Sequence, residues 1–278
     1  MTDYGAAWSA SLRRGTDAEL RGWVDAGLRW SDEADTIALR HYRRGVTINR
    51  KPDRTFVTEA DTAIEQLVRD RVRAELPGHG VIGEEYGDDA GGASVRWYVD
   101  PIDGTHNYMR GVPLFATLLA AERDGELQAA VMSAPALASR WFAWRGGGAW
   151  GIDGGESTPR RLGVSRIDRL DEAQVLYAGT VDVEASGRAP GFRALLAAAW
   201  RERGFGDFWG YALVADGAAE AMVEVDLQVW DAAAPTLIVE EAGGRVTDFD
   251  GRRGLDGKTF LATNGILHER VLARLAAD

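Results

Sequence analysis

Cysteine is absent from the 278-residue chain, which excludes disulfides, thiolate catalysis and zinc sites built on cysteine. The absence fits a reducing compartment. No apolar run approaches the roughly 18 residues of a membrane-spanning helix, and residues 1–16 lack the apolar core of a signal peptide. We therefore expect a cytoplasmic protein with no membrane partner.

Positive charge is in short supply, because 32 Lys and Arg residues stand against 43 Asp and Glu residues, for a net charge of −11. This balance argues against a general nucleic-acid or anionic-membrane binder. A small phosphorylated substrate is still compatible with the charge, since a bound cation reverses the local field. Hydrophobic residues make up 45% of the chain, enough for a sizeable core in one large domain or two packed subdomains.

Hydrophobic periodicity changes along the chain. Helical spacing predicts amphipathic helices over residues 17–44 and 58–77, and alternating segments separated by turns then predict an antiparallel meander. In the second half of the chain, predicted strands and helices alternate. We predict an α+β fold with an N-terminal α+β subdomain over 1–140, which holds the antiparallel sheet, and a C-terminal α/β subdomain over 141–278. The predicted strands include 97–99, 115–123, 127–133, 140–145, 174–177, 221–225 and 259–262, and the later helices are 191–201, 211–216, 232–241 and 267–277.

An acidic turn is predicted directly after the strand of bulky residues at 97–99. Pro101 fixes its own φ and lacks the N–H that a central ladder needs, so we expect the strand to end there. Asp100 and Asp103 flank the turn and can direct two carboxylates at one point. Gly104 allows close approach of a ligand to the backbone. Taken alone, Asp-Pro-x-Asp-Gly is also compatible with an ordinary surface turn.

Further acids stand at the ends of predicted elements. Asp61 lies in the first turn of a helix, Glu84 and Glu85 end a strand, Glu224 ends another, and Asp231 begins a helix. Each has a simple structural explanation as a helix cap, a first-turn acid or a solvated charge. Together they predict a cleft into which several carboxylates point, a surrounding that suits a hard divalent cation.

Four segments of the chain carry a more specific signal: Gly83-Glu84-Glu85, Asp100-Pro101-Ile102-Asp103-Gly104-Thr105-His106-Asn107, Trp230-Asp231-Ala232-Ala233-Ala234 and Glu241-Ala242-Gly243-Gly244. Their order and separation resemble the inositol monophosphatase family, and the resemblance covers residues 17–275. It implies a layered α-β-α-β-α sandwich of the inositol monophosphatase and fructose-1,6-bisphosphatase type. It also implies a homodimeric, lithium-sensitive phosphatase with two or three Mg²⁺ per site and Mn²⁺ as an alternative ion.

The resemblance also implies metal ligands at the matching positions. Glu84, Asp100 and the Ile102 carbonyl would hold the first ion. Asp100, Asp103 and Asp231 would hold the second. Glu84, through water, would contribute to a third and weaker site.

Catalytic and phosphate-binding roles carry over in the same way. Gly104 and Thr105 would donate backbone N–H groups to the phosphate. Asp61 would accept a hydrogen bond from the Thr105 hydroxyl and, with Glu84, would help to deprotonate the attacking water. The loop at Lys51 would close near the site. Phosphocysteine chemistry is excluded, and the four histidines include no Arg-His-Gly motif of a histidine phosphatase.

Substrate choice is expected to depend on the second half of the chain. Gly206-Asp207-Phe208 followed by Tyr-x-Leu-Val-Ala, with Arg110-Gly111-Val112-Pro113 and Ser133-Ala134-Pro135-Ala136, resembles the histidinol-phosphate phosphatase branch of the family. Asp207 and Glu224, with Asp231 nearby, would bind the ammonium and imidazole of such a substrate. Asp207 is also compatible with a helix cap, and His106 with either a site or a surface role.

Other functions remain open at this point. The first alternative is an inositol-1-phosphate or broad sugar-phosphate phosphatase, and a nucleotide 3′-phosphatase is a further one. A catalytically inactive metal-binding relative would have lost a ligand, yet every expected carboxylate is present. A calcium-binding protein would need regularly spaced Asp and Asn residues in one loop, which the chain lacks.

Overall fold

The computed structural model describes residues 18–43, 48–50, 56–154, 156, 158–255 and 258–277. Contacts between residues divide the chain into two units. The first ends at Arg161 and the second begins at Leu162. The predicted boundary at residue 140 is therefore wrong. It falls within the first unit because the strands at Gly148–Ile152 and Arg160–Arg161 continue the same sheet.

The first unit is built from long helices and a mainly antiparallel sheet. Its helices are α2 (Ala18–His41), α3 (Glu59–Glu75) and α4 (Thr105–Met109), with a 3₁₀ turn at Pro135–Leu137. Its strands are β1 (Ile48–Arg50), β2 (Phe56–Thr58), β3 (Gly80–Gly83), β4 (Gly87–Asp88), β5 (Val95–Asp103), β6 (Ala116–Arg123), β7 (Glu126–Ala134), β8 (Ser139–Trp144), β9 (Gly148–Ile152) and β10 (Arg160–Arg161).

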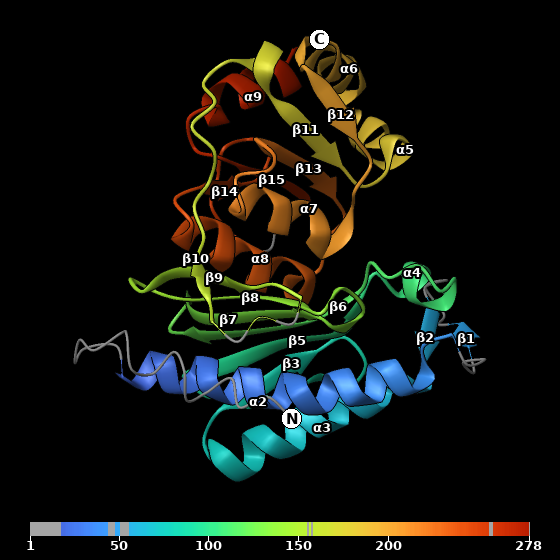
Figure 1. Ribbon diagram of the computed structural model, residues 1–278, viewed down its shortest axis with the longest axis vertical. Helices are drawn as coiled ribbons and strands as arrows, with labels where there is room; N and C mark the ends of the chain where they lie inside the picture. Colours follow the sequence, from blue (N-terminus) through green and yellow to red (C-terminus); the bar gives the residue numbers. More distant parts are fainter. Residues whose placement is uncertain are drawn as a thin grey trace. The chain divides into compact units, whose positions relative to one another are not determined.

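Eight of these strands form one sheet in the order β10-β9-β8-β7-β6-β5-β3-β4. The predicted meander is confirmed in β6, β7 and β8, and only β3 and β5 are parallel neighbours in this sheet. Helices α2 and α3 lie side by side across one face (Figure 1). Their apolar stripes form a core with alternate strand residues, and in it the Trp30 ring meets the Trp97 ring edge-on at 4.9 Å.

Strand β5 continues through Pro101, which corrects the expected turn at that residue. The ladder between β5 and β6 is irregular between Asp100 and Asp103, so the missing N–H of Pro101 breaks no regular pairing. The Thr117 hydroxyl donates a hydrogen bond to the Pro101 carbonyl at 2.8 Å. The two carboxylates of this segment therefore belong to the irregular end of a strand.

The second unit has a five-stranded sheet in the order β12-β11-β13-β15-β14. Strands β12, β11 and β13 are parallel, whereas β15 is antiparallel to both of its neighbours. Its strands are β11 (Gln174–Tyr177), β12 (Arg201–Arg203), β13 (Ala221–Val225), β14 (Arg245–Thr247) and β15 (Thr259–Thr263). Its helices are α5 (Thr180–Val183), α6 (Ala189–Ala198), α7 (Asp207–Ala215), α8 (Val229–Glu241) and α9 (His268–Leu275), with a 3₁₀ turn at Leu170–Glu172 and a π-helical segment at Glu184–Arg188.

Side chains along β13 point alternately to the two faces of this sheet, and each face packs against different helices. Ala221 and Val223 join the core formed with α6 and α9. Met222 faces α7, because a Cβ added at Gly210 of that helix would lie 2.4 Å from its sulfur. Glu224 has the same parity as Met222 and therefore also points to the α7 face.

Both units combine sheets with helices, so the α+β prediction is confirmed (Figure 1). The helix predicted over 191–201 ends earlier, at Ala198, because Arg201 pairs with Gln174 in the sheet. No helix in the described ranges is both long and apolar enough to cross a membrane.

Candidate active site

The turn after β3 carries Glu84, the first of the predicted metal ligands. The Glu84 N–H donates to the Val99 carbonyl at 3.3 Å, which continues the parallel pairing with β5 beyond the strand end. The next two N–H groups, of Glu85 and Tyr86, donate to the Glu65 carboxylate at 2.6 and 3.1 Å. The backbone on both sides of Glu84 is therefore held by hydrogen bonds.

The end of β5 carries the next candidates. Asp100 is 2% exposed, and its Oδ1 accepts the Ile102 N–H at 3.0 Å. Asp103 is 9% exposed and precedes Gly104, which has the left-handed φ of 79° that glycine adopts without strain. The Ile102 carbonyl accepts the Thr105 hydroxyl at 2.9 Å. Carboxylate and carbonyl oxygens thus follow one another within a few residues.

Asp61 lies in the first turn of α3, as predicted, and is completely buried. Its Oδ2 accepts the Thr58 N–H at 2.8 Å and the Thr58 hydroxyl at 2.5 Å, which forms a capping box. Its Oδ1 is buried without a hydrogen-bond partner in the described part of the chain. Burial, aided by the nearby Glu84 charge and opposed by Thr58, raises the pKa of Asp61 to about 6.

The expected hydrogen bond from Thr105 to Asp61 is not formed in this structure. Thr105 is the first residue of α4, and its hydroxyl reaches back to the carbonyl three residues before it. The hydroxyl that bonds to Asp61 comes from Thr58 instead.

In the second unit, Asp231 is the third residue of α8, which begins at Val229. Its Oδ2 accepts the Gln228 N–H at 2.8 Å and completes a capping box. Asp231 is therefore not the N-cap that the sequence left open, because the helix starts earlier than residue 232.

Asp207 and Glu224 meet at the start of α7. Asp207 has φ 58°, a left-handed conformation that is uncommon for a residue with a side chain and is enriched at functional sites. Its N–H donates to Glu224 Oε1 at 3.4 Å, and Glu224 Oε2 is buried with no partner among the described residues. Burial and the Asp207 charge raise the pKa of Glu224 to about 8, against a smaller opposing effect of the Tyr211 hydroxyl.

Asp61 and Glu224 thus share two features: a raised pKa and one buried carboxylate oxygen without a partner in the described ranges. Such groups concentrate at functional sites. The described residues contain no ready-made group of three or more His, Asp or Glu side chains placed to hold a metal. The donor set nevertheless fits a hard divalent cation, since it consists of carboxylates and a carbonyl, and Asp61 retains an unbonded oxygen.

The structure says less about the remaining predicted residues. His106 is exposed. Lys51 and residues 1–17 lie outside the described residues. Sequence reasoning missed Thr58 and Glu65. The Thr58-x-x-Asp61 spacing of a capping box and the i,i+4 spacing of Glu65 and Arg69 were signals that could have found them.

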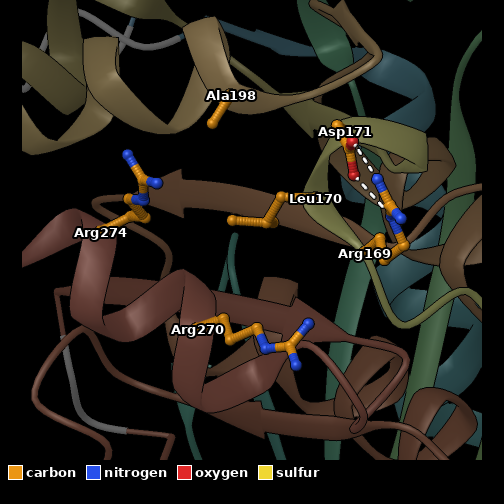
Figure 2. A pocket seen from close by; sticks show the side chains of 6 residues that line it. All are labelled: Arg169, Leu170, Asp171, Ala198, Arg270 and Arg274. Atoms are coloured by element: carbon orange, nitrogen blue, oxygen red, sulfur yellow. Dashed lines mark hydrogen bonds and ion pairs between the residues drawn. The ribbon is translucent and has the colours of Figure 1, made fainter.

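A separate pocket of about 490 Å³ lies in the second unit, and Figure 2 shows its lining. It contains none of the predicted site residues. Two of its guanidinium groups have partners nearby: Arg169 binds Asp171 at 2.5 Å, and Arg270 donates to the Asp168 carbonyl. We therefore do not assign the candidate active site to this pocket.

The sequence matches the family model described as the inositol monophosphatase family over residues 21–278. A histidinol-phosphatase of Mycobacterium tuberculosis is 43% identical over 252 residues, which cover 90% of this chain and 96% of the relative. A histidinol-phosphatase of Streptomyces coelicolor is 41% identical and covers 88% of this chain and 93% of the relative. Among solved structures, an IMPase of Thermotoga maritima has a TM-score of 0.81 at 29% identity, covering 91% of this chain and 96% of that one, which confirms the predicted fold type.

Proposed function

Because the chain belongs to the inositol monophosphatase family, we propose that it is a magnesium-dependent phosphatase that converts L-histidinol phosphate and water into L-histidinol and phosphate. The observation that carries this proposal is the similarity to two histidinol-phosphatases over nearly the whole chain. The family supports the reaction class, a phosphoric monoester hydrolase. The acids near Asp207 supply a physical reason for the choice of a cationic substrate.

The proposed metal ligands are Glu84, Asp100, the Ile102 carbonyl, Asp103 and Asp231. We propose two or three Mg²⁺ per site, with Mn²⁺ as an alternative ion. Magnesium supplies positive charge that polarises the phosphoryl group and stabilises the leaving oxygen. The five donors are all hard oxygens, which is the ligand type that magnesium prefers.

The chain's own groups perform the remaining steps. Asp61, with Glu84, takes a proton from the attacking water, and a pKa of about 6 suits a general base that works near neutral pH. The Gly104 and Thr105 N–H groups donate to the phosphate. The proposed bond from Thr105 to Asp61 requires the hydroxyl to turn away from the Ile102 carbonyl, which it binds in this structure.

Asp207, Glu224 and Asp231 are proposed to bind the ammonium and imidazole of histidinol. Asp207 would offer a charge-assisted hydrogen bond to either cation. The raised pKa of Glu224, about 8, favours its protonated form in the free protein at neutral pH. A cation placed beside it favours the ionised form, so substrate binding and loss of this proton are expected to be coupled.

An inositol-1-phosphate or sugar-phosphate phosphatase is the second candidate, favoured by the structural likeness to the Thermotoga maritima IMPase. A neutral polyol offers no cation to Glu224 or Asp207. Such a substrate would therefore form no charge-assisted hydrogen bond with either acid, which is why we rank it second.

A phosphate-release assay distinguishes the two candidates. The purified protein is given histidinol phosphate, inositol-1-phosphate, fructose-1,6-bisphosphate and a 3′-phosphonucleotide, each with Mg²⁺ or with a chelator. We expect release from histidinol phosphate to exceed the others and to stop without the metal. Faster release from inositol-1-phosphate would favour the second candidate, and release unaffected by the chelator would contradict both.

We also propose a cytoplasmic homodimer. The dimer follows from the family resemblance, and the absence of cysteine is compatible with a reducing compartment. Light scattering on the purified protein and cell fractionation test the two statements separately.

A further inference from the structure

Glu65 is a completely buried acid beneath the turn that follows β3. Its two oxygens accept the N–H groups of Glu85 and Tyr86, the two residues directly after Glu84. The carboxylate is thus bonded to main chain next to a proposed metal ligand. No role in the reaction described so far uses it.

Arg69 fixes the Glu65 carboxylate from the other side. It lies four residues later on α3, is 6% exposed, and donates Nε and Nη2 to Glu65 Oε1 at 2.9 and 2.7 Å. The same guanidinium donates to the Gly87 carbonyl and pairs with Asp89 at 2.8 Å. The turn between β3 and β4 is therefore bonded at its start by Glu65 and at its end by Arg69.

Gly83 leaves room for this carboxylate. A Cβ added there would lie 2.3 Å from Glu65 Oε1 and 2.4 Å from its Cδ. Because Glu65 is buried and bonded to Arg69, it has no freedom to withdraw. The absence of a side chain at Gly83, the residue before Glu84, therefore allows the Glu65 carboxylate to approach the backbone closely.

We propose that Glu65, held by Arg69, is a positioning residue that fixes the Glu84 turn and thereby sets the affinity of the site for a divalent cation. The proposal rests on the proposed function, because it takes Glu84 as a metal ligand. If the two N–H bonds were lost, the Glu84 carboxylate would have to be ordered at the moment of ion binding. That ordering costs conformational entropy, which weakens binding.

The test uses Glu65→Gln in the full-length protein, with Asp70→Asn as the matched control. Glutamine keeps the volume of Glu65 but turns an amide N–H₂ toward a group that donates. Asp70 lies on the same helix, where it accepts bonds from Gln66 and Arg73 on the exposed surface. Isothermal titration of Mn²⁺, without substrate, measures affinity independently of turnover.

We expect Glu65→Gln to weaken Mn²⁺ binding by roughly 10- to 100-fold, the usual range when a partner of a metal ligand is changed. Asp70→Asn should bind like the wild type. A folded Glu65→Gln protein, checked by circular dichroism, with wild-type Mn²⁺ affinity would overturn the proposal.

Amide hydrogen exchange in the wild-type protein covers the case in which Glu65→Gln fails to fold. The proposal predicts that the Glu85 and Tyr86 amides exchange far more slowly than the same amides in an unstructured peptide of this sequence, because both donate to the buried Glu65 carboxylate. Exchange at the rate of the unstructured peptide would also overturn it. Failure of the proposed function gives a different result, because the wild type would then not hydrolyse histidinol phosphate whatever the Mn²⁺ affinity of the variants.

Discussion

The two units treat buried charge differently. In the first unit, Glu65 binds Arg69, and Glu122 binds both Arg96 and the Tyr98 hydroxyl. Burial alone would raise the pKa of Glu122, yet these partners together lower it. In the second unit, the buried Glu224 accepts the Asp207 N–H, and the buried His268 lies between the Thr247 and Thr263 hydroxyls, so these partners of both are uncharged groups.

The difference shows which buried groups can respond to a ligand. Glu224 has a pKa raised to about 8, and burial lowers the pKa of His268 to about 4, so both are neutral near pH 7. In the first unit, Glu65 and Glu122 are paired with arginines and also accept backbone N–H groups, so they hold main chain in place. Asp61, also in the first unit, is bonded by Thr58 rather than by a cation and belongs to the candidate site. A raised pKa without a counter-charge thus marks Asp61 and Glu224 as acids that can respond to a ligand.

The largest expected effect comes from removing one proposed ligand from either unit. Asp103→Asn or Asp231→Asn should each lower kcat by roughly 10³-fold or more, because a metal contributes several kcal/mol to transition-state stabilisation. Initial-rate assays at saturating Mg²⁺ measure the loss, with circular dichroism as the folding control. Near-normal turnover in either variant would contradict the ligand assignment for that unit.

Removing a cation from an ion pair of the first unit tests how much such pairs contribute to stability. Arg140 is 9% exposed and pairs with Asp32 and Asp35. Arg140→Met should lower the free energy of unfolding by about 3–5 kcal/mol, since it leaves Asp35, whose side chain is 14% exposed, without its cation.

The matched control is Arg169→Met, which removes the exposed pair with Asp171 and should lower the stability far less, because solvent screens this pair. Urea unfolding measures both variants. Equal losses would show that burial does not decide the strength of these pairs.

Asp207→Ala tests whether the acids of the second unit determine substrate selectivity without affecting the hydrolysis step itself. We expect kcat/KM for histidinol phosphate to fall by roughly 10- to 100-fold, the loss of a charge-assisted hydrogen bond of about 1.5–3 kcal/mol. An aryl phosphate, which has no ammonium group, should be hydrolysed at close to the wild-type rate. Equal losses on both substrates would reject the pairing with the ammonium group.

The smallest effect is a pH dependence of stability due to His268, which lies between the Thr247 and Thr263 hydroxyls. Its pKa is about 4 in the folded protein and near 6.5 when unfolded, so between these values the unfolded chain binds the extra proton. Its contribution is therefore lost as pH falls from 6.5 to 4, by about 2 kcal/mol at pH 5.

His268→Gln keeps hydrogen-bonding groups between the two threonines but does not titrate. Urea-unfolding midpoints at pH 7.5 and pH 5 should therefore fall less in this variant than in the wild type. The same fall in both proteins would assign the pH dependence to other groups.

Local patterns predicted most of the elements, because periodicity and turn residues act over a few neighbours. Strands at Gln174–Tyr177 and Ala221–Val225 have the predicted bounds, and the acids of the candidate site stand at element ends as expected. Pro101 was misplaced because the irregular pairing with β6 tolerates it, and that irregularity involves a strand that follows later in the chain.

The amino-acid sequence by itself determined the family, the helices and strands, and the donor types that a divalent cation requires. Only the tertiary structure decided which acids are held by partners and which are left neutral and responsive. The physical reason is that burial and counter-charges come from residues distant in the sequence. Glu65 accepts the N–H of Glu85, which lies twenty residues later in the sequence. Glu224 accepts the N–H of Asp207, which lies seventeen residues earlier.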